Sequence, residues 1–255
     1  MDAGRYFDAH ELERFRRDGY VVVPGLFGPG ALSRIEAWTR EVAGMPEVPG
    51  RHMVYYEDCL SEPGRRVLSR IENFCPYHPG FEALLADGEL LARVSELFAE
   101  PAVLFKEKIN FKLPGGGGFQ AHQDVQAGWD AYATLHITVL VSIDAATAEN
   151  GCLELVPGAH TRGLIGEKWK PLAEDESPEL RFVASPTQPG DAVFFDSFVP
   201  HRSGPNLSDS PRRVLYVTYN RLSEGDHRAR YYADKRRSYP PDCEREAGTH
   251  YTFRV

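Results

Sequence analysis

Two hydrophobic patterns divide the chain, and they predict helices in its first part and strands after them. Apolar residues recur at helical spacing near 8–19, 30–43 and 80–99. The first segment opens with Asp8 and Glu11, which resemble a capping box, and Gly19 can end it. The run YVVVPGLF that follows predicts a strand. The apolar stripes of the three helices indicate packing faces rather than a cofactor site.

From about residue 102 the period changes to two, which is typical of strands. The segment 103–113 alternates strictly, so that Val103, Phe105, Ile109 and Phe111 face one way and Lys106, Lys108, Asn110 and Lys112 the other. Segment 134–143 alternates as well, with Thr134, His136 and Thr138 on one side. Further strands are expected near 152–156, 181–185, 192–196 and 212–221, with turns rich in Gly and Pro between them.

Helices followed by many short strands predict an α+β fold that is mainly β, a sandwich or jelly roll behind a helical layer. The chain shows no internal repeat and no low-complexity linker, so we expect a single domain over residues 1–255. The acidic, proline-bounded stretch at 170–181 predicts a mobile loop or the edge of a lid.

Composition narrows the classes of partner. The 255 residues carry a formal net charge of −8, which disfavours binding to a phosphate backbone, so no nucleic acid partner is expected. No apolar run approaches the length of a membrane span, and the polar start lacks the core of a signal peptide. We therefore expect a cytoplasmic protein with no membrane partner, while its oligomeric state stays open.

The cysteines limit the chemistry of any metal site. They stand at 59, 75, 152 and 243 without a CxxC pair, so neither a zinc knuckle nor a thioredoxin-type site is indicated. Free buried thiols are the expected state. The ligands of any bound metal should then be histidine and carboxylate.

A short histidine–aspartate pair gives the first chemical signal. His122 and Asp124 follow the glycine run PGGGG, and on a strand they would share one face. Such a pair also arises by chance, so it needs support. His201, after the apolar segment QPGDAVFFDSFVP, would complete the two-histidine, one-carboxylate triad of non-heme Fe(II) oxygenases. Arg212, eleven residues later, suits the far carboxylate of a 2-oxoglutarate co-substrate.

Together the ordered motifs HQD, ENGCLELVPGAH, PGDAVFF, PHRSGPN and PRR resemble the phytanoyl-CoA dioxygenase family, which includes ectoine hydroxylase and bacterial tailoring and phosphonate hydroxylases. The resemblance covers most of the chain and implies a double-stranded β-helix braced by N-terminal helices. It implies Fe(II) on His122, Asp124 and His201. It also implies 2-oxoglutarate contacts, which we expect at Arg212, Asn110, Ser203 and Thr138.

The activity that the resemblance implies is an Fe(II)- and 2-oxoglutarate-dependent dioxygenase. It would use O2 to hydroxylate an unactivated C–H bond of a small polar metabolite, such as an amino acid, a phosphonate or a natural-product intermediate, and release succinate and CO2. Hydroxylation rather than halogenation is expected, because related halogenases have Gly or Ala in place of Asp124. The alternative is a non-catalytic metal-binding barrel that binds a metabolite without turnover, but the retained triad and Arg212 argue against it.

Three residues are candidates for substrate binding: Lys108, Trp129 and Tyr132. Lys108 lies on the strand before the metal motif and could bind an anionic group, although lysines there could also be solvated decoration of an edge strand. Trp129 and Tyr132 follow Asp124 closely. They could be plain packing, or they could wall a pocket whose aromatic faces suit an alkyl-ammonium group. His136 is expected to be a hydrogen-bonded wall residue rather than a metal ligand.

Overall fold

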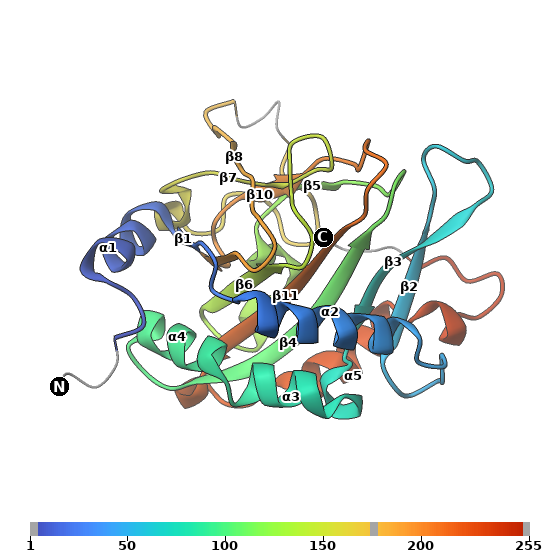
Figure 1. The fold of residues 1–255 in the computed structure, drawn as a ribbon, viewed down its shortest axis with the longest axis horizontal. Coiled ribbons are helices and arrows are strands. Elements are labelled where there is room, and N and C mark those ends of the chain that lie inside the picture. The colour runs from blue at the N-terminus through green and yellow to red at the C-terminus, as the bar shows by residue number, and fades with distance from the viewer. Residues whose placement is uncertain (1–4, 174–177, 252–255) are drawn as a thin grey trace.

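The computed structural model describes residues 5–173 and 178–251, and these form two antiparallel sheets with helices beside them (Figure 1). The larger sheet has the strand order β1-β9-β6-β11-β4-β3-β2, and the smaller has the order β5-β10-β7-β8. The arrangement is a jelly-roll barrel, so the α+β, mainly β prediction is confirmed.

The helices are α1 (Ala9–Asp18), α2 (Pro29–Ala43), α3 (Pro79–Ala86), α4 (Glu89–Phe98) and α5 (Arg228–Ser238). The strands are β1 (Tyr20–Val23), β2 (Met53–Asp58), β3 (Arg66–Glu72), β4 (Ala102–Lys112), β5 (Phe119–His122), β6 (His136–Ser142), β7 (Leu153–Leu155), β8 (Val183–Ser185), β9 (Ala192–Asp196), β10 (His201–Ser203) and β11 (Arg212–Arg221).

Helices α2, α3 and α4 run across one face of the larger sheet (Figure 1). Their apolar stripes enter one hydrophobic core, in which Phe81 and Leu85 of α3 join Ile109 of β4 and Leu215 of β11. All four side chains are fully buried, and each such burial stabilises the fold by roughly 1.5–3 kcal/mol. This core fixes the outer face of β4 and β11, so their inner faces are left for the barrel.

The predicted start and end of the first helix are confirmed. Glu11 N donates to Asp8 Oδ1 and Asp8 N donates to Glu11 Oε2, both at 2.8 Å, which is a complete capping box. Gly19 ends the helix at φ 80°, and an added Cβ there would lie 2.5 Å from the ring of His160. Glycine is therefore required at this position both by its backbone angle and by the close approach of the histidine.

Other elements differ from the expectation. The segment 80–99 is two helices, because the chain breaks at Asp87 and Gly88 before α4 begins. Strands β2 and β3 and helix α5 were not predicted. Helix α5 has the sequence RARYYADKRRS, whose charged residues leave no continuous apolar stripe.

The possibility that the lysines of β4 decorate an edge strand is wrong. Strand β4 pairs with β3 on one side and β11 on the other. Strict alternation along β4 is also wrong, because a bulge interrupts its pairing with β11 at Phe105. As a result Leu104 joins the helix-side core, while Phe105 packs in a separate cluster with Trp129 and Tyr231.

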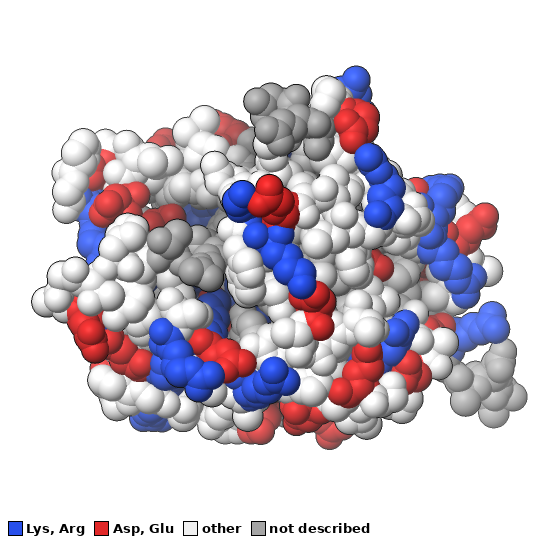
Figure 2. All heavy atoms as spheres, turned by 180° about the vertical axis from the view of Figure 1, so that it is seen from behind, with Lys and Arg blue, Asp and Glu red and all other residues white. Residues whose placement is uncertain are grey.

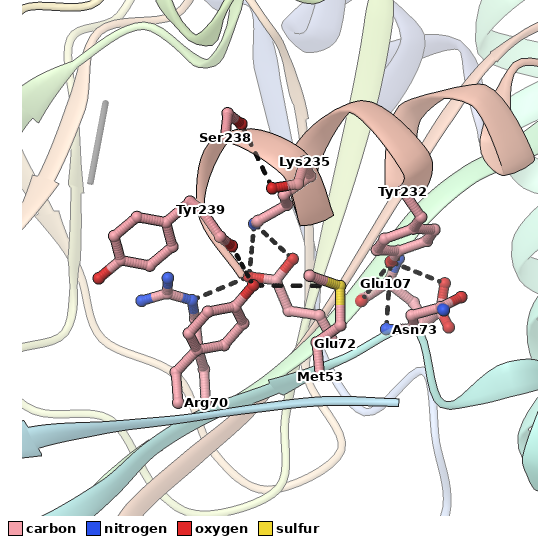
Figure 3. Close-up of polar contacts among 10 residues, drawn as sticks. Met53, Arg70, Glu72, Asn73, Glu107, Tyr232, Lys235, Ser238 and Tyr239 are labelled. Atoms are coloured by element: carbon pink, nitrogen blue, oxygen red, sulfur yellow. Dashed lines mark hydrogen bonds and ion pairs between the residues drawn. The ribbon is translucent and has the colours of Figure 1, made fainter. Parts of the chain in front are cut away.

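Helix α5 is fixed to β4 by a buried ion pair. Glu107 of β4 is fully buried and accepts from Arg228, with Nη2 at 2.6 Å from Oε1 and Nε at 3.2 Å from Oε2. The hydroxyl of Tyr232 accepts a hydrogen bond from Glu107 N at 3.0 Å and donates one to Glu107 O at 2.9 Å. Figure 3 shows Tyr232 beside the carboxylate of Glu107. These contacts set the position of every α5 side chain that points toward the barrel.

The remaining expectations have mixed outcomes. All four cysteines are free; three are buried, while Cys243 is exposed. Residues 174–177 of the predicted mobile loop or lid edge lie outside the described residues. Among the described helices none has the length and hydropathy needed to span a bilayer. Basic and acidic side chains are interspersed on the face seen in Figure 2. The single domain, the cytoplasmic location and the absence of a nucleic acid partner stay predictions.

Substituting Glu107 should loosen helix α5 and destabilise the protein. In Glu107→Gln the largely buried charge of Arg228 loses its partner, so the free energy of unfolding should fall by about 3 kcal/mol, as measured by urea denaturation. Glu62→Gln removes an exposed ion pair with Arg65 and should change it by less than about 0.5 kcal/mol. Equal effects of the two substitutions would contradict the anchoring role.

Candidate metal centre and pocket

Three side chains of the smaller sheet and its following turn converge at one end of the barrel. His122 ends β5 and His201 begins β10, and the two are direct partners across the strand pair, with ring centroids 4.3 Å apart. Asp124 starts a 3-10 turn (Asp124–Ala127). Ligand atoms of the three residues all lie within 4.8 Å of one another. The turn, not strand alternation, brings Asp124 to the cluster, since β5 ends at His122.

Each member of the cluster is oriented by a hydrogen bond on its far side. His122 Nδ1 donates to Gln120 O at 2.7 Å and His201 Nδ1 donates to Val199 O at 3.0 Å, because a carbonyl can only accept. This leaves both Nε2 atoms without a proton and available to a metal. Thr138 Oγ1 lies 3.0 Å from Asp124 Oδ2 and donates to it.

The electrostatics keep these groups in the protonation states that bind metal. Burial, together with a smaller effect of the neighbouring His201, lowers the pKa of His122 to about 3. Burial also lowers the pKa of His201. Burial alone would raise the pKa of Asp124, but the two histidines and the lysines of β4 together outweigh it, so that pKa lies below its usual value. Neutral imidazoles and an ionised carboxylate are the forms that a metal requires.

A narrow inner cavity of about 30 Å³ adjoins the cluster. Among the residues expected to contact the co-substrate, Asn110, Thr138 and Ser203 line it. Asn110 Oδ1 is buried and has no hydrogen-bond partner among the described residues. The structure therefore brings these three polar side chains together beside the candidate metal ligands.

Arg212 and Arg213 have opposite surroundings. Arg212 is 1% exposed, and neither its Nε nor its Nη2 has a partner in the described part of the chain. It lies against Tyr216, which lines the inner cavity. Arg213 points away, and its Nε and Nη2 donate to Asp144 at 2.8 and 2.7 Å. Of these two arginines, Arg212 is thus the one whose side chain is available to an anion inside the barrel.

A wider outer cavity of about 280 Å³ also borders His122 and Asp124. All three residues expected to bind substrate line it, and they are Lys108, Trp129 and Tyr132. Helix α5 supplies much of the opposite wall. The sequence analysis did not assign other lining residues to a substrate site, among them Glu72, Lys106, Trp169, Tyr231, Asp234 and Lys235.

Two lysines of β4 face this outer cavity without a counter-ion. Lys106 Nζ lies 5.1 Å from the ring centroid of Trp129 and 5.3 Å from that of Tyr231, so it occupies the aromatic faces that could have suited an alkyl-ammonium group. Burial, together with a smaller effect of Lys106, lowers the pKa of Lys108 to about 8. Neither ammonium forms an ion pair with a carboxylate of the described residues. Their positive charge is directed at the cavity.

A third lysine at this cavity is neutralised. Lys235 Nζ donates to both carboxylate oxygens of Glu72, at 2.7 and 2.6 Å, and Arg70 Nε donates to the same group at 2.8 Å (Figure 3). Burial would raise the pKa of Glu72, but Lys235, Lys106 and Arg70 outweigh it and hold that pKa below its usual range. Glu72 thus forms its ion pairs with Lys235 and Arg70, and it forms none with Lys106 or Lys108.

His136 lies in the wall, as expected, and is not part of the metal cluster. Its ring is 4.5 Å from that of Phe105 and 5.3 Å from that of Trp129, measured between centroids. Its Nε2 is buried, and no described residue pairs with it, so the hydrogen bond expected for this residue is missing at that atom. The ring serves as a packing surface behind Trp129.

Comparisons with known proteins agree with this geometry. The family model described as phytanoyl-CoA dioxygenase (PhyH) matches residues 15–214. The chain is 42% identical over 248 residues to 2-aminoethylphosphonate dioxygenase of uncultured bacterium HF130_AEPn_1, which covers 97% of this chain and 94% of that one. It is 41% identical over 230 residues to methylphosphonate hydroxylase of Gimesia maris, which covers 90% and 86%.

A solved structure supports the fold. EctD from S. alaskensis, crystallised with 2-oxoglutarate and 5-hydroxyectoine, superimposes with a TM-score of 0.74 at 21% identity, covering 88% of this chain and 79% of that chain. A second crystal structure of that protein, with bound Fe, superimposes with a TM-score of 0.72. At this level of identity the likeness concerns the fold, which is the double-stranded β-helix expected from the sequence.

Removing one histidine of the cluster should abolish metal binding, while removing the nearby wall histidine should not. Losing a residue that only hydrogen-bonds to a metal ligand costs roughly 10–100-fold in metal affinity. His201→Ala removes a ligand itself, so it should weaken Fe(II) binding by more than that. His136→Ala should retain wild-type affinity. Anaerobic equilibrium dialysis with metal analysis measures both. Fe(II) binding by His201→Ala at wild-type strength would show that the metal lies elsewhere.

Proposed function

The chain belongs to the phytanoyl-CoA dioxygenase family and is an Fe(II)- and 2-oxoglutarate-dependent dioxygenase, and from this premise we propose that it hydroxylates a C–H bond of a small phosphonate. The observation that carries the proposal is the pair of unmatched ammonium groups, Lys106 and Lys108, at the outer cavity beside the candidate metal ligands. The two relatives above 40% identity are both named for oxidation of a phosphonate, which supports the same substrate class.

Charge distinguishes a phosphonate from the other substrates expected from the sequence. A phosphoryl group carries more than one negative charge near pH 7 and has three strong acceptor oxygens. Two ammonium groups without counter-ions match that charge, whereas the single carboxylate of an amino acid would leave one of them unpaired in a buried site. A cavity of about 280 Å³ suits a small substrate.

We assign the metal to His122, Asp124 and His201. Bound iron and 2-oxoglutarate together supply the oxidising chemistry, in which O2 is consumed, succinate and CO2 are released, and one oxygen atom is added to the substrate. The protein's part is to hold the ligands in place. Its backbone carbonyls fix both imidazole rings, and Thr138 fixes one oxygen of Asp124 so that the other can face the metal. In this assignment Thr138 holds a metal ligand, and it also lines the inner cavity in which the co-substrate is expected.

We assign the far carboxylate of 2-oxoglutarate to Arg212, with Ser203 and Asn110 as neutral partners. A buried guanidinium without an anion costs several kcal/mol, and the carboxylate would remove that cost. The unpartnered Nε and Nη2 atoms of Arg212 can donate to its two oxygens. Trp129 and Tyr132 would then wall the outer cavity and limit water around the reacting carbon.

Replacing either β4 lysine should weaken phosphonate binding selectively. Lys106→Met and Lys108→Met each remove one charged hydrogen-bond donor, worth roughly 1.5–3 kcal/mol, so KM for methylphosphonate or 2-aminoethylphosphonate should rise by about 10–100-fold. Succinate release measures turnover. The matched control is Lys168→Met, which removes an exposed lysine paired with Asp130 and should leave KM unchanged.

Sulfonates separate charge from shape in the same assay. Methanesulfonate and taurine have the outline of the two phosphonates but carry only one negative charge on the acidic group. The wild-type protein should turn them over poorly, and the lysine variants should lose most of this selectivity. Efficient turnover of sulfonates, or phosphonate KM values that do not respond to Lys106 and Lys108, would argue against a phosphonate substrate.

The two adjacent arginines should differ in their effect on the co-substrate. Arg212→Ala should weaken the binding of 2-oxoglutarate by at least about 30-fold, because losing the partner of a buried charge costs on the order of 2–5 kcal/mol. Arg213→Ala removes only the pair with Asp144 and should leave that affinity nearly unchanged. Anaerobic titration of the Fe(II)-loaded protein gives both values. Equal losses, or the reverse order, would contradict the assignment.

A further inference from the structure

Beside Arg212 lies a second buried cation that has no counter-ion. Lys112 ends β4 and is the register partner of Arg212 on β11. Its side chain is buried, at 2% exposure, and Nζ donates to Ser203 Oγ at 2.8 Å and to the backbone carbonyls of Gly204 and Gly151. All three acceptors are neutral. Neither cation forms an ion pair with a carboxylate of residues 5–173 or 178–251.

Two other buried cations show that this interior can supply a counter-ion. Lys235 is paired with Glu72 and Arg228 with Glu107, in each case at 2.6 Å. Lys112 and Arg212, like Lys106 and Lys108 at the outer cavity, have no such pair among the described residues. Two adjacent buried charges of one sign repel each other and lose solvation, so they persist at a site where an anion binds.

We propose that Lys112 is a positioning residue for the far carboxylate of 2-oxoglutarate, acting through the hydroxyl of Ser203 and through its own charge next to Arg212. The inference rests on the proposed role of Arg212. Because Nζ donates to Ser203 Oγ, the hydroxyl uses a lone pair there and keeps its proton for another acceptor. A carboxylate in the inner cavity, which Ser203 lines, is the acceptor that the surrounding charges favour.

Protonation of Lys112 should be coupled to the co-substrate. Burial, together with Arg212 on β11, lowers the pKa of Lys112 to about 7, while Glu57 on β2 and Cys152 beside β7 act in the opposite direction. A bound carboxylate stabilises the ammonium form and raises this pKa. Binding then takes up a proton between about pH 7 and the raised value, so affinity for 2-oxoglutarate should fall as the pH increases through that window.

A purely structural role makes a different prediction. Lys112 Nζ also donates hydrogen bonds to the carbonyls of Gly151 and Gly204, which belong to two loops. These loops pack closely, because an added Cβ at Gly151 would lie 2.1 Å from Gly204 O. If the lysine only held these loops, its loss would weaken every 2-oxo acid alike. If it acts on the far carboxylate, a 2-oxo acid without that group should be unaffected.

The experiment compares 2-oxoglutarate with pyruvate, which lacks the far carboxylate, on the Fe(II)-loaded protein without oxygen. Affinity comes from the visible charge-transfer band, and proton uptake from calorimetry in two buffers of different ionisation enthalpy. For the wild type, the Kd of 2-oxoglutarate should rise by up to about tenfold per pH unit above pH 7, with proton uptake. The Kd of pyruvate should not respond.

Two variants isolate the lysine. Lys112→Met should weaken the binding of 2-oxoglutarate by about 10–100-fold and abolish proton uptake. The affinity for pyruvate should stay unchanged. Lys112→Arg keeps a charge that does not titrate, so it should restore part of the affinity without the pH dependence. Equal weakening of both acids by Lys112→Met would overturn the proposal in favour of loop packing.

The wild type alone still tests the idea if the variants do not fold. Tight 2-oxoglutarate binding with no proton uptake and no pH dependence between pH 7 and 9 would overturn the role of Lys112 while leaving the proposed function intact. A wild-type protein that binds neither acid would overturn the co-substrate site itself.

Discussion

Positive charge buried in the barrel without matching carboxylates is the constraint on which this site depends. Lys106 and Lys108 line both cavities, while Lys112 and Arg212 are register partners next to Ser203 and Tyr216, which line the inner one. Both cavities border His122 and Asp124, so this positive charge surrounds one metal cluster. Since anions relieve the cost of these charges, ligand binding and the stability of the folded protein are thermodynamically linked.

Strand β4 can hold this charge because its two faces carry side chains with different contacts. Its inner face carries the lysines, while Glu107 on the outer face receives Arg228 of α5. Neighbouring strands on both sides satisfy its backbone, so the strand remains fixed despite its polar side chains. The bulge at Phe105 lets the same strand supply Leu104 to the helix-side core and Phe105 to the pocket cluster. One strand thus connects the core, the pocket and the C-terminal helix.

The parts of the site that local patterns encode could be predicted from the sequence. The triad follows from a short motif and a distal histidine, and Arg212 follows from its spacing after His201. The rest depends on contacts between distant segments. Glu72 and Lys235 pair across 163 positions, and no periodicity in either segment indicates that partner. Whether β4 lay inside the sheet or at its edge depended on β3, whose presence was not apparent from its own residues.

Helix α5 enters the fold only after the last barrel strand, and it contributes neither a candidate iron ligand nor a candidate 2-oxoglutarate contact. It nevertheless builds one wall of the outer cavity through Tyr231 and Lys235. It is attached to the sheet through Glu107, which does not line this cavity, and through the Glu72–Lys235 pair, which does. A substitution in this C-terminal helix can therefore change the shape and charge of the outer cavity without touching the strands that carry the candidate metal ligands.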